Sequence, residues 1–489
     1  MTPRRVLVAA AVLAGALLLM TPAWLVGHPD IFPDTSSYEL IGQWLFEKAG
    51  IGVHSGFGYL RHRADLALFF TMAGARSWTY GLLMFVLAIW GSGWALIAAQ
   101  ALTGSALLAV ALRAVAGRLD LRTFGGLALL LTAASSLPFF VSFLMPDVFA
   151  GYAALSAVLL VFFFDRLRRL ERAFVGLLLA ASLSFHATNP LLALVIGGCG
   201  LIAMWLRGAS WRPAAAGLST LLAALVFSLA TSAVYPPAVK ALAHRELHRP
   251  PFITARLLAD GPGRIYLRQA CASGQPYVIC RYKDRPLTDA NDILWHPGNR
   301  GVYEVSDLNT RLAMIAEQPR FVRGVMAFDP LGAVSRLIGN SGLELALVTV
   351  VDTLGYSGRL LSQAPAFDPP LHGASFCVRR PNYCHATSFQ TGWDDLIIVG
   401  VMASVGYLLL RLGRTFGRRR LASVLPMSAP MSAAVVSVLA AVLANGVVCG
   451  ALSGVYPRYQ MRLIWIVPLF AALAWLEARR ARRAAQTAG

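Results

Sequence analysis

The chain has 489 residues, of which 57% are hydrophobic and 14% charged, and its mean hydropathy is +0.61. A soluble domain of this size would carry about 25% charged residues. Runs of about 20 apolar residues, long enough to cross a hydrocarbon core about 30 Å thick, recur along the chain. The composition therefore predicts an all-α polytopic membrane protein.

The formal net charge is +19, which in a soluble protein would indicate nucleic-acid binding. Many of the arginines fall in short clusters between apolar runs, a pattern typical of membrane topology signals. We therefore expect membrane lipids to surround the chain, and no nucleic-acid partner.

The N-terminal segment contains Arg4 and Arg5, and an apolar run follows over residues 6–26. A signal peptide with a cleavage site at Thr21-Pro22-Ala23 is one interpretation. The run has 21 residues, which is long for the apolar part of a signal peptide. The sequence thus favours a retained first helix whose preceding arginines lie in the cytoplasm.

The apolar runs predict about ten transmembrane helices, over residues 6–26, 94–115, 124–144, 148–164, 173–185, 190–206, 214–234, 396–412, 433–452 and 463–476. If these helices alternate from a cytoplasmic start, the arginine-rich segments all fall on the cytoplasmic side: 118–122, 165–172, 207–212, 414–420 and the tail from 479. The short loops on the other side carry little positive charge, apart from Arg458 and Arg462 in the last one, so this is the positive-inside pattern. It predicts that both termini are cytoplasmic and that two long segments lie on the outer side.

These two outer segments divide the chain into three parts. The membrane core, 1–234, contains the first periplasmic loop, 27–93; a periplasmic, mainly helical insertion domain covers 235–395; and 396–489 holds the last transmembrane helices and a basic tail. Within the first loop, residues 36–48 predict a short helix with Tyr38 and Trp44 at the membrane interface. The apolar run 78–90 is too short to span and predicts an interfacial or re-entrant helix. In the insertion domain, helices are expected near 252–260 and 308–337.

Four of the six cysteines lie in the insertion domain, whereas Cys199 and Cys449 lie in apolar spans and are expected to be packing residues. An even number on one side predicts two disulfides in an oxidising compartment. Three pairings are possible, and the short-loop choice is Cys271–Cys280 with Cys377–Cys384. Zinc binding is the alternative, but neither pair has the C-x2–4-C spacing of structural zinc sites.

Polar residues gather at the outer ends of the predicted helices. The predicted helices 173–185 and 463–476 have 13 and 14 residues, which at 1.5 Å per residue gives only about 20 Å. Their outer ends would then lie below the membrane surface. An ionised group near the bilayer centre costs about 3 kcal/mol, so such groups line a wet cavity or pair with one another. We expect an outward-opening cavity lined by His28, Tyr38, Asp147, His186, Asn189 and Tyr459, with Asp30, Asp34 and several arginines.

Each of these residues also has a simpler structural interpretation. Asp147 follows Pro146 and could cap the next helix. His186 could bond a backbone carbonyl, and Arg458 and Arg462 could be arginines that reach out to the membrane interface. Asp30 and Asp34 could be loop acids.

The string Phe-Pro-Asp-Thr-Ser-Ser-Tyr at residues 32–38, directly after the first helix, is similar to the segment that carries the catalytic acid in several bacterial GT-C glycosyltransferases. Over residues 1–234 the layout also resembles this superfamily, which includes protein O-mannosyltransferases and lipid A aminoarabinose transferases. The resemblance implies a polyprenyl-phosphate-sugar donor and a catalytic acid in the first outer loop. That acid maps onto Asp34, with Asp30 as the weaker candidate.

The chemistry of such a transfer suits the residues at the outer face. A carboxylate can deprotonate the acceptor hydroxyl, and arginines can stabilise the leaving phosphate. Arg458, Arg462 and Arg76 are the candidates for binding that lipid phosphate. The chain departs from this superfamily in one respect, because it lacks the Asp-x-Asp or Asp-Glu pair with which some members bind a divalent metal. A divalent metal is therefore possible but not supported, and we expect that no cofactor is required.

The sequence therefore predicts an inverting glycosyltransferase of the bacterial inner membrane. Its active site would face the periplasm, and its acceptor would be a lipid, a glycan or a protein. A polymerase or ligase of polyprenyl-diphosphate-linked glycans is a related alternative. A lipid or glycan transporter, such as a flippase, belongs to another class, but the inverted repeats typical of transporters are not evident. A non-enzymatic assembly scaffold would leave the buried polar residues unexplained.

Overall fold

The computed structural model describes residues 3–27, 29–32, 34–51, 66–350, 388–417 and 426–488. Within these ranges the regular elements are helices, and an isolated β-bridge joins Asp30 to Phe143. Seven helical segments of this part are long and apolar enough to cross a membrane: Gly93–Ala116, Val148–Arg166, Asn189–Leu206, Ala215–Ala243, Gly392–Phe416, Ala429–Leu452 and Pro457–Thr487. The chain is thus an all-α polytopic membrane protein, as its composition predicts.

The helices before the insertion domain are α1 (Pro3–Leu19), α2 (Thr21–Val26), α3 (Thr35–Lys48), α4 (Leu66–Phe70), α5 (Trp78–Ala116), α6 (Leu121–Ala134), α7 (Leu137–Val141), α8 (Val148–Phe163), α9 (Arg169–Phe185), α10 (Asn189–Leu206) and α11 (Ala215–Ala243). Those that follow are α12 (Phe252–Asp260), α13 (Pro262–Ala272), α14 (Ala290–Trp295), α15 (Leu308–Phe328), α16 (Pro330–Ala346), α20 (Ser388–Phe416), α21 (Ala429–Leu452), α22 (Pro457–Ile464) and α23 (Ile466–Ala488). Short 3-10 helices are η2 (Ala73–Ala75), η3 (Phe164–Arg166), η4 (Arg212–Ala214) and η5 (Val278–Tyr282).

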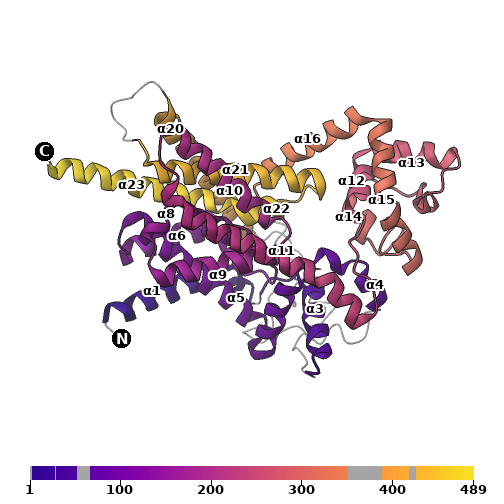
Figure 1. Ribbon diagram of the computed structural model, residues 1–489, viewed down its shortest axis with the longest axis horizontal. Coiled ribbons are helices and arrows are strands. Elements are labelled where there is room, and N and C mark those ends of the chain that lie inside the picture. The colour runs from indigo at the N-terminus through magenta and orange to yellow at the C-terminus, as the bar shows by residue number, and fades with distance from the viewer. Residues whose placement is uncertain are drawn as a thin grey trace.

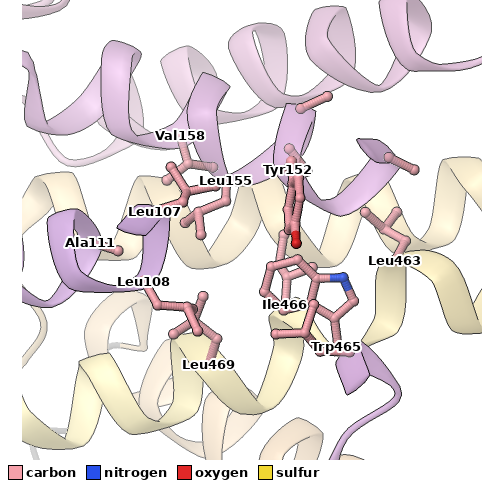
Figure 2. Packing of buried hydrophobic residues seen from close by; sticks show 14 of the residues in the cluster. Leu107, Leu108, Ala111, Tyr152, Leu155, Val158, Leu463, Trp465, Ile466 and Leu469 are labelled. Carbon is pink, nitrogen blue, oxygen red and sulfur yellow. The ribbon is translucent and has the colours of Figure 1, made fainter. Parts of the chain in front are cut away.

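The long helices form a bundle with the α12–α15 unit at one end and both termini at the other (Figure 1). Helix α8 is the centre of this bundle, because every residue from Val148 to Phe163 is buried. A helix that is apolar on all sides must be surrounded by other helices. Figure 2 shows part of this packing, where Tyr152 and Leu155 of α8 meet Leu107 of α5 and Ile466 of α23.

Small residues allow the closest approaches to α8. A side chain at Gly151 would place its Cβ 2.3 Å from the indole nitrogen of Trp465. A Cβ at Gly217 of α11 would lie 1.8 Å from the carbonyl oxygen of Leu160. Both contacts are below van der Waals distance, so larger residues at either position would push α11 or the α22–α23 junction away from the core.

The α12–α15 unit, which we call the outer unit after the side on which the sequence predicts it, has a hydrophobic core of its own that includes Leu258, Leu267, Tyr303 and Phe321. The Cys271–Cys280 disulfide joins α13 to η5 across a Cα–Cα distance of 5.7 Å, so this predicted pair is confirmed. Cys377 and Cys384 lie outside the described residues. Helix α12 has the predicted bounds, whereas the predicted stretch 308–337 is divided at Asp329, where Pro330 starts α16.

Helix α16 does not belong to the outer unit alone. Its second half packs on the end of α21 that is nearest to the outer unit, where the Ser341 hydroxyl donates to the carbonyl of Val447 at 3.3 Å. A Cβ at Gly450 of α21 would lie 2.9 Å from Cβ of Glu344. The predicted insertion domain therefore contributes one helix to the packing of the membrane core.

Two length predictions are wrong. The run 78–90 is not a separate short helix, because it is the first part of the 39-residue helix α5; its interfacial or re-entrant placement stays a prediction. Helix α9 starts at Arg169 and has 17 residues, and a nearly continuous helical segment of 31 residues runs over Pro457–Thr487. The sequence-based spans stopped at charged residues, but these residues continue the helices; Glu171, for example, accepts the backbone N–H of Arg168 at 2.7 Å.

The short helix of the first loop is confirmed as α3, and its two aromatic residues pack inside the protein. Tyr38 and Trp44 are buried. The Tyr38 ring meets the ring of Tyr80 edge-on at 5.1 Å, and Trp44 meets Phe70 at 5.3 Å. Helix α3 therefore packs into the protein along α5 rather than lying on lipid.

The predicted span 124–144 is also broken. Helix α6 ends at Ala134 and the short helix α7 begins at Leu137, where Pro138 occupies the first turn. Neither α6, nor α9, nor the α1–α2 pair is among the seven segments that are long and apolar enough to span. The number of ten transmembrane helices therefore stays a prediction.

Candidate functional site

The segment after α2 is held against the turn that precedes α8. The backbone N–H of Asp30 donates to the carbonyl of Ser142 at 2.8 Å, and the N–H of Leu144 donates to the carbonyl of Asp30 at 2.9 Å. The Thr35 hydroxyl adds a bond of 3.1 Å to the carbonyl of Leu144. These contacts bring the start of α3, with Asp34, close to the start of α8, with Asp147.

Asp34 occupies the N-cap position of α3, but its side chain does not cap the helix. Its Oδ1 instead accepts a hydrogen bond from Nη2 of Arg76 at 2.6 Å, and its Oδ2 lies 3.9 Å from Nη1 of Arg458. The exposed fractions of the three side chains are 24% for Asp34, 14% for Arg76 and 13% for Arg458. We call these three residues the acid–arginine cluster.

The two arginines of the acid–arginine cluster keep unused donors. Arg76 Nε and Arg458 Nη1 are buried and have no hydrogen-bond partner among the described residues. The Arg458 guanidinium also lies 3.9 Å from the centre of the Phe32 ring, a cation–π contact that fixes its position. Buried donors normally have partners, so this cluster is suited to an anion that brings its own acceptor oxygens.

Tyr38 lies next to the acid–arginine cluster, one turn into α3. Burial raises the pKa of its phenol, and the charge of Arg76 offsets this only in part. The hydroxyl of Tyr38 therefore stays protonated at neutral pH.

Arg462 is the centre of a second group, and its side chain is 0% exposed. Its Nη1 lies 3.8 Å from Oδ1 of Asp147, which is 3% exposed, and 3.2 Å from Nε2 of His186. Its Nη2 donates to Oγ1 of Thr188 at 3.0 Å and to Oδ1 of Asn445 at 3.1 Å. We call these five residues the buried arginine network. It joins α8, α10, α21 and α22.

His186 is neutral in this network. Burial lowers its pKa well below the usual value, and the charge of Arg462 lowers it further. Because arginine only donates, Nε2 of His186 must accept from Arg462. Its Nδ1 lies 2.9 Å from the Thr188 hydroxyl and 3.3 Å from the backbone nitrogen of Thr188. His186 therefore stabilises the charge of Arg462 and adds none of its own.

The simpler interpretations of two residues do not match the geometry. Asp147 occupies the N-cap position of α8 but makes no side-chain cap bond. The Arg462 guanidinium is fully enclosed by protein groups, so it does not reach out to a membrane interface. Both side chains instead face each other inside the bundle.

The remaining predicted residues have different surroundings. The Asn189 amide donates to the carbonyl of Ser182 at 2.8 Å and so joins α9 to α10. The Tyr459 ring lies between the two groups, 5.1 Å from the guanidinium of Arg458 and 5.6 Å from that of Arg462. The side chain of Asp30 is buried, and His28 lies outside the described residues.

Sequence reasoning missed Asn445 and Glu344. Asn445 stands in the middle of the apolar run of α21, so a polar residue at bilayer depth was a usable signal for it. Glu344 is fully buried and accepts the backbone N–H of Tyr456 at 2.8 Å, two residues before Arg458. No sequence signal marked it, because it lies in a segment of mixed composition.

No family model, curated protein or solved structure matches this chain. Among the residues that the structure describes, no group of three or more His, Cys, Asp or Glu side chains is arranged to hold a metal ion.

Proposed function

We propose that this protein is a glycosyltransferase that moves a sugar from a polyprenyl-phosphate donor to a lipid, glycan or protein acceptor. The observation that carries the proposal is the acid–arginine cluster in the first loop. A carboxylate at a helix start is turned away from its helix, one oxygen is held by Arg76, and the other faces Arg458 beyond hydrogen-bond distance. The acid can deprotonate an acceptor hydroxyl, and the two arginines can stabilise a leaving phosphate.

The proposed reaction is a displacement with inversion at the anomeric carbon. Oδ2 of Asp34 takes the proton of the acceptor hydroxyl, whose oxygen forms the new bond to the sugar. The bond from the anomeric carbon to the phosphate oxygen breaks, and its electron pair stays on the leaving polyprenyl phosphate. Arg76 and Arg458 donate hydrogen bonds to the charge that develops on this phosphate.

The geometry divides the roles of the predicted residues. Arg76, Arg458 and Arg462 each keep a buried donor without a partner among the described residues. Arg76 and Arg458 are 14% and 13% exposed, whereas Arg462 is 0% exposed and donates to Thr188 and Asn445 inside the protein. We therefore assign phosphate binding to the first two arginines and a positioning role to Arg462. Of the two acids, Asp34 is favoured as the base, because its carboxylate is 24% exposed and lies beside Arg76 and Arg458, whereas Asp30 is only 2% exposed.

Replacement of Asp34 by Asn tests the proposal in membranes supplied with labelled polyprenyl-phosphate sugars. General-base catalysis contributes about 10²- to 10⁴-fold, so we expect a loss of transfer in that range. The matched control is Asp284→Asn, the same chemical change at an exposed position of the outer unit, which should transfer at the wild-type rate. Unchanged transfer by Asp34→Asn would refute the assigned base.

The released product separates the alternative functions. A transferase of the proposed kind releases polyprenyl phosphate, a polymerase or ligase of diphosphate-linked glycans releases polyprenyl diphosphate, and a flippase moves its lipid without cleaving it. Only the first product agrees with the proposal.

The proposed location is the bacterial inner membrane, with both termini in the cytoplasm and the acid–arginine cluster facing the periplasm. The positive-inside pattern supports this orientation. A reporter inserted after Lys283, an exposed residue of the outer unit, should report the periplasm. A cytoplasmic signal would reverse the orientation and remove the periplasmic acceptor from the proposal.

A further inference from the structure

Glu344 is a fully buried acid that connects the insertion domain to α22, the helix that carries Arg458 and Arg462. It lies on α16, where this helix packs on α21, and a Cβ at Gly450 would lie 2.6 Å from the carbonyl oxygen of Asn340. Its Oε2 accepts the backbone N–H of Tyr456 at 2.8 Å. Its Oε1 is buried and has no hydrogen-bond partner in the part of the chain that the structure describes.

Tyr456 is the N-cap residue of α22, and no side chain within that turn caps the helix. The first N–H groups of a helix lack partners inside the helix, and negative charge near them is favourable. Glu344, which precedes Tyr456 by 112 residues, supplies such an acceptor from another element. Arg458 follows in the first turn of α22. Any contact that fixes this turn therefore also fixes the backbone position from which the Arg458 side chain extends.

We propose that Glu344 is a positioning residue that holds the first turn of α22 and thereby sets the Arg458 guanidinium opposite Asp34. Two contacts show what must be set. The guanidinium lies 3.9 Å from the centre of the Phe32 ring, and its Nη1 lies 3.9 Å from Oδ2 of Asp34. The catalytic part of this inference rests on the proposed function, whereas the structural part does not.

The acceptor oxygen matters here more than the charge. Burial raises the pKa of Glu344 to about 7, and the N–H of Tyr456 and the charge of Arg462 oppose this rise. At neutral pH the side chain is therefore partly protonated. Glu344→Gln keeps an oxygen that can accept the Tyr456 N–H and removes only the charge, whereas Glu344→Ala removes the acceptor.

The structural test is hydrogen exchange of the full-length protein in lipid nanodiscs, followed in peptides that cover residues 453–464. Glu344→Ala should speed exchange of this segment about fivefold, the size of effect expected when a helix cap is lost. Glu344→Gln should exchange at the wild-type rate, as should Arg336→Ala, an exposed change on the same helix. If Glu344→Ala does not fold, Glu344→Asp takes its place, because its shorter side chain withdraws the acceptor. Unchanged exchange in the alanine variant, or in its replacement, would overturn the inference.

The functional test compares the KM for the polyprenyl-phosphate-sugar donor. Glu344→Ala should raise this KM about tenfold with a smaller change in kcat, and Glu344→Gln should restore it. The Glu344→Ala, Arg458→Ala double variant should be no worse than Arg458→Ala alone, because both changes remove the same contact. Additive effects, or a wild-type KM in Glu344→Ala when Arg458→Ala raises it, would contradict the positioning role. If Asp34→Asn and Arg458→Ala both leave transfer unchanged, the proposed function fails, and the exchange measurement alone decides the inference.

Discussion

The buried pair of Arg462 and Asp147 should contribute strongly to stability, and its coupling can be measured. The closest nitrogen and oxygen atoms are 3.8 Å apart, and the side chains are 0% and 3% exposed. At that distance and an effective dielectric constant of about 20, Coulomb's law gives an attraction of roughly 4 kcal/mol, which is an upper limit. Removing one partner leaves an uncompensated charge, so Arg462→Met and Asp147→Asn should each cost about 3 kcal/mol.

A double-mutant cycle isolates the pair. The free energy of unfolding is measured by SDS titration of the wild type, both single variants and the double variant in mixed micelles. If each single variant loses about 3 kcal/mol of unfolding free energy, we expect the double variant to lose only about 4 kcal/mol, which corresponds to a coupling energy of about 2 kcal/mol. The control is the Lys240–Glu246 pair, whose side chains are 69% and 65% exposed and whose coupling should stay below about 0.5 kcal/mol. Equal coupling in the two cycles would refute the reasoning about burial.

Three further predictions concern other parts of the chain. Arg76→Ala and Arg458→Ala should each raise the donor KM at least about tenfold, and lysine should restore little because it lacks the planar fork of donors; Arg281→Ala, at an exposed position, should leave KM unchanged. Cys271→Ser opens a disulfide with a sequence separation of 9 residues, for which loop entropy predicts a loss of roughly 2–3 kcal/mol, visible as faster proteolysis of the outer unit. The pKa of Glu344 is raised from 4.5 to about 7, so stability that is present at pH 4 is lost as the pH rises through 7. The thermal midpoint of the wild type should therefore fall between pH 5 and pH 8 more steeply than that of Glu344→Gln, and an equal or shallower slope in the wild type would contradict this assignment.

The membrane character and several elements could be predicted because they depend on local patterns. Apolar runs of sufficient length and arginine-rich loops define most of the core. The start of α3 after Asp34 follows from a proline, an acid and a hydroxyl residue in sequence, and the bounds of α12 follow from its own composition. The short-loop disulfide of Cys271 and Cys280 likewise depends on spacing alone.

Features that depend on distant contacts could not be predicted in this way. Helix α9 continues through charged residues because Glu171 pairs with Arg113 of α5, a partner that no local pattern reveals. The carboxylate of Asp34 accepts a hydrogen bond from Arg76, which lies 42 residues further along the chain. The short helices predicted at 173–185 and 463–476, which would place Arg462 at bilayer depth, are longer in the structure. Arg462 is instead buried because α22 packs among α8, α16 and α21.

The most direct test of the central claim is a single-turnover measurement with a labelled polyprenyl-phosphate sugar in membranes that contain either the wild type or Asp34→Asn. The proposal predicts that the wild type releases polyprenyl phosphate as the sugar is transferred, and that Asp34→Asn slows this step at least about 100-fold. Release at the wild-type rate by Asp34→Asn, or no release by the wild type with any such donor, would contradict it.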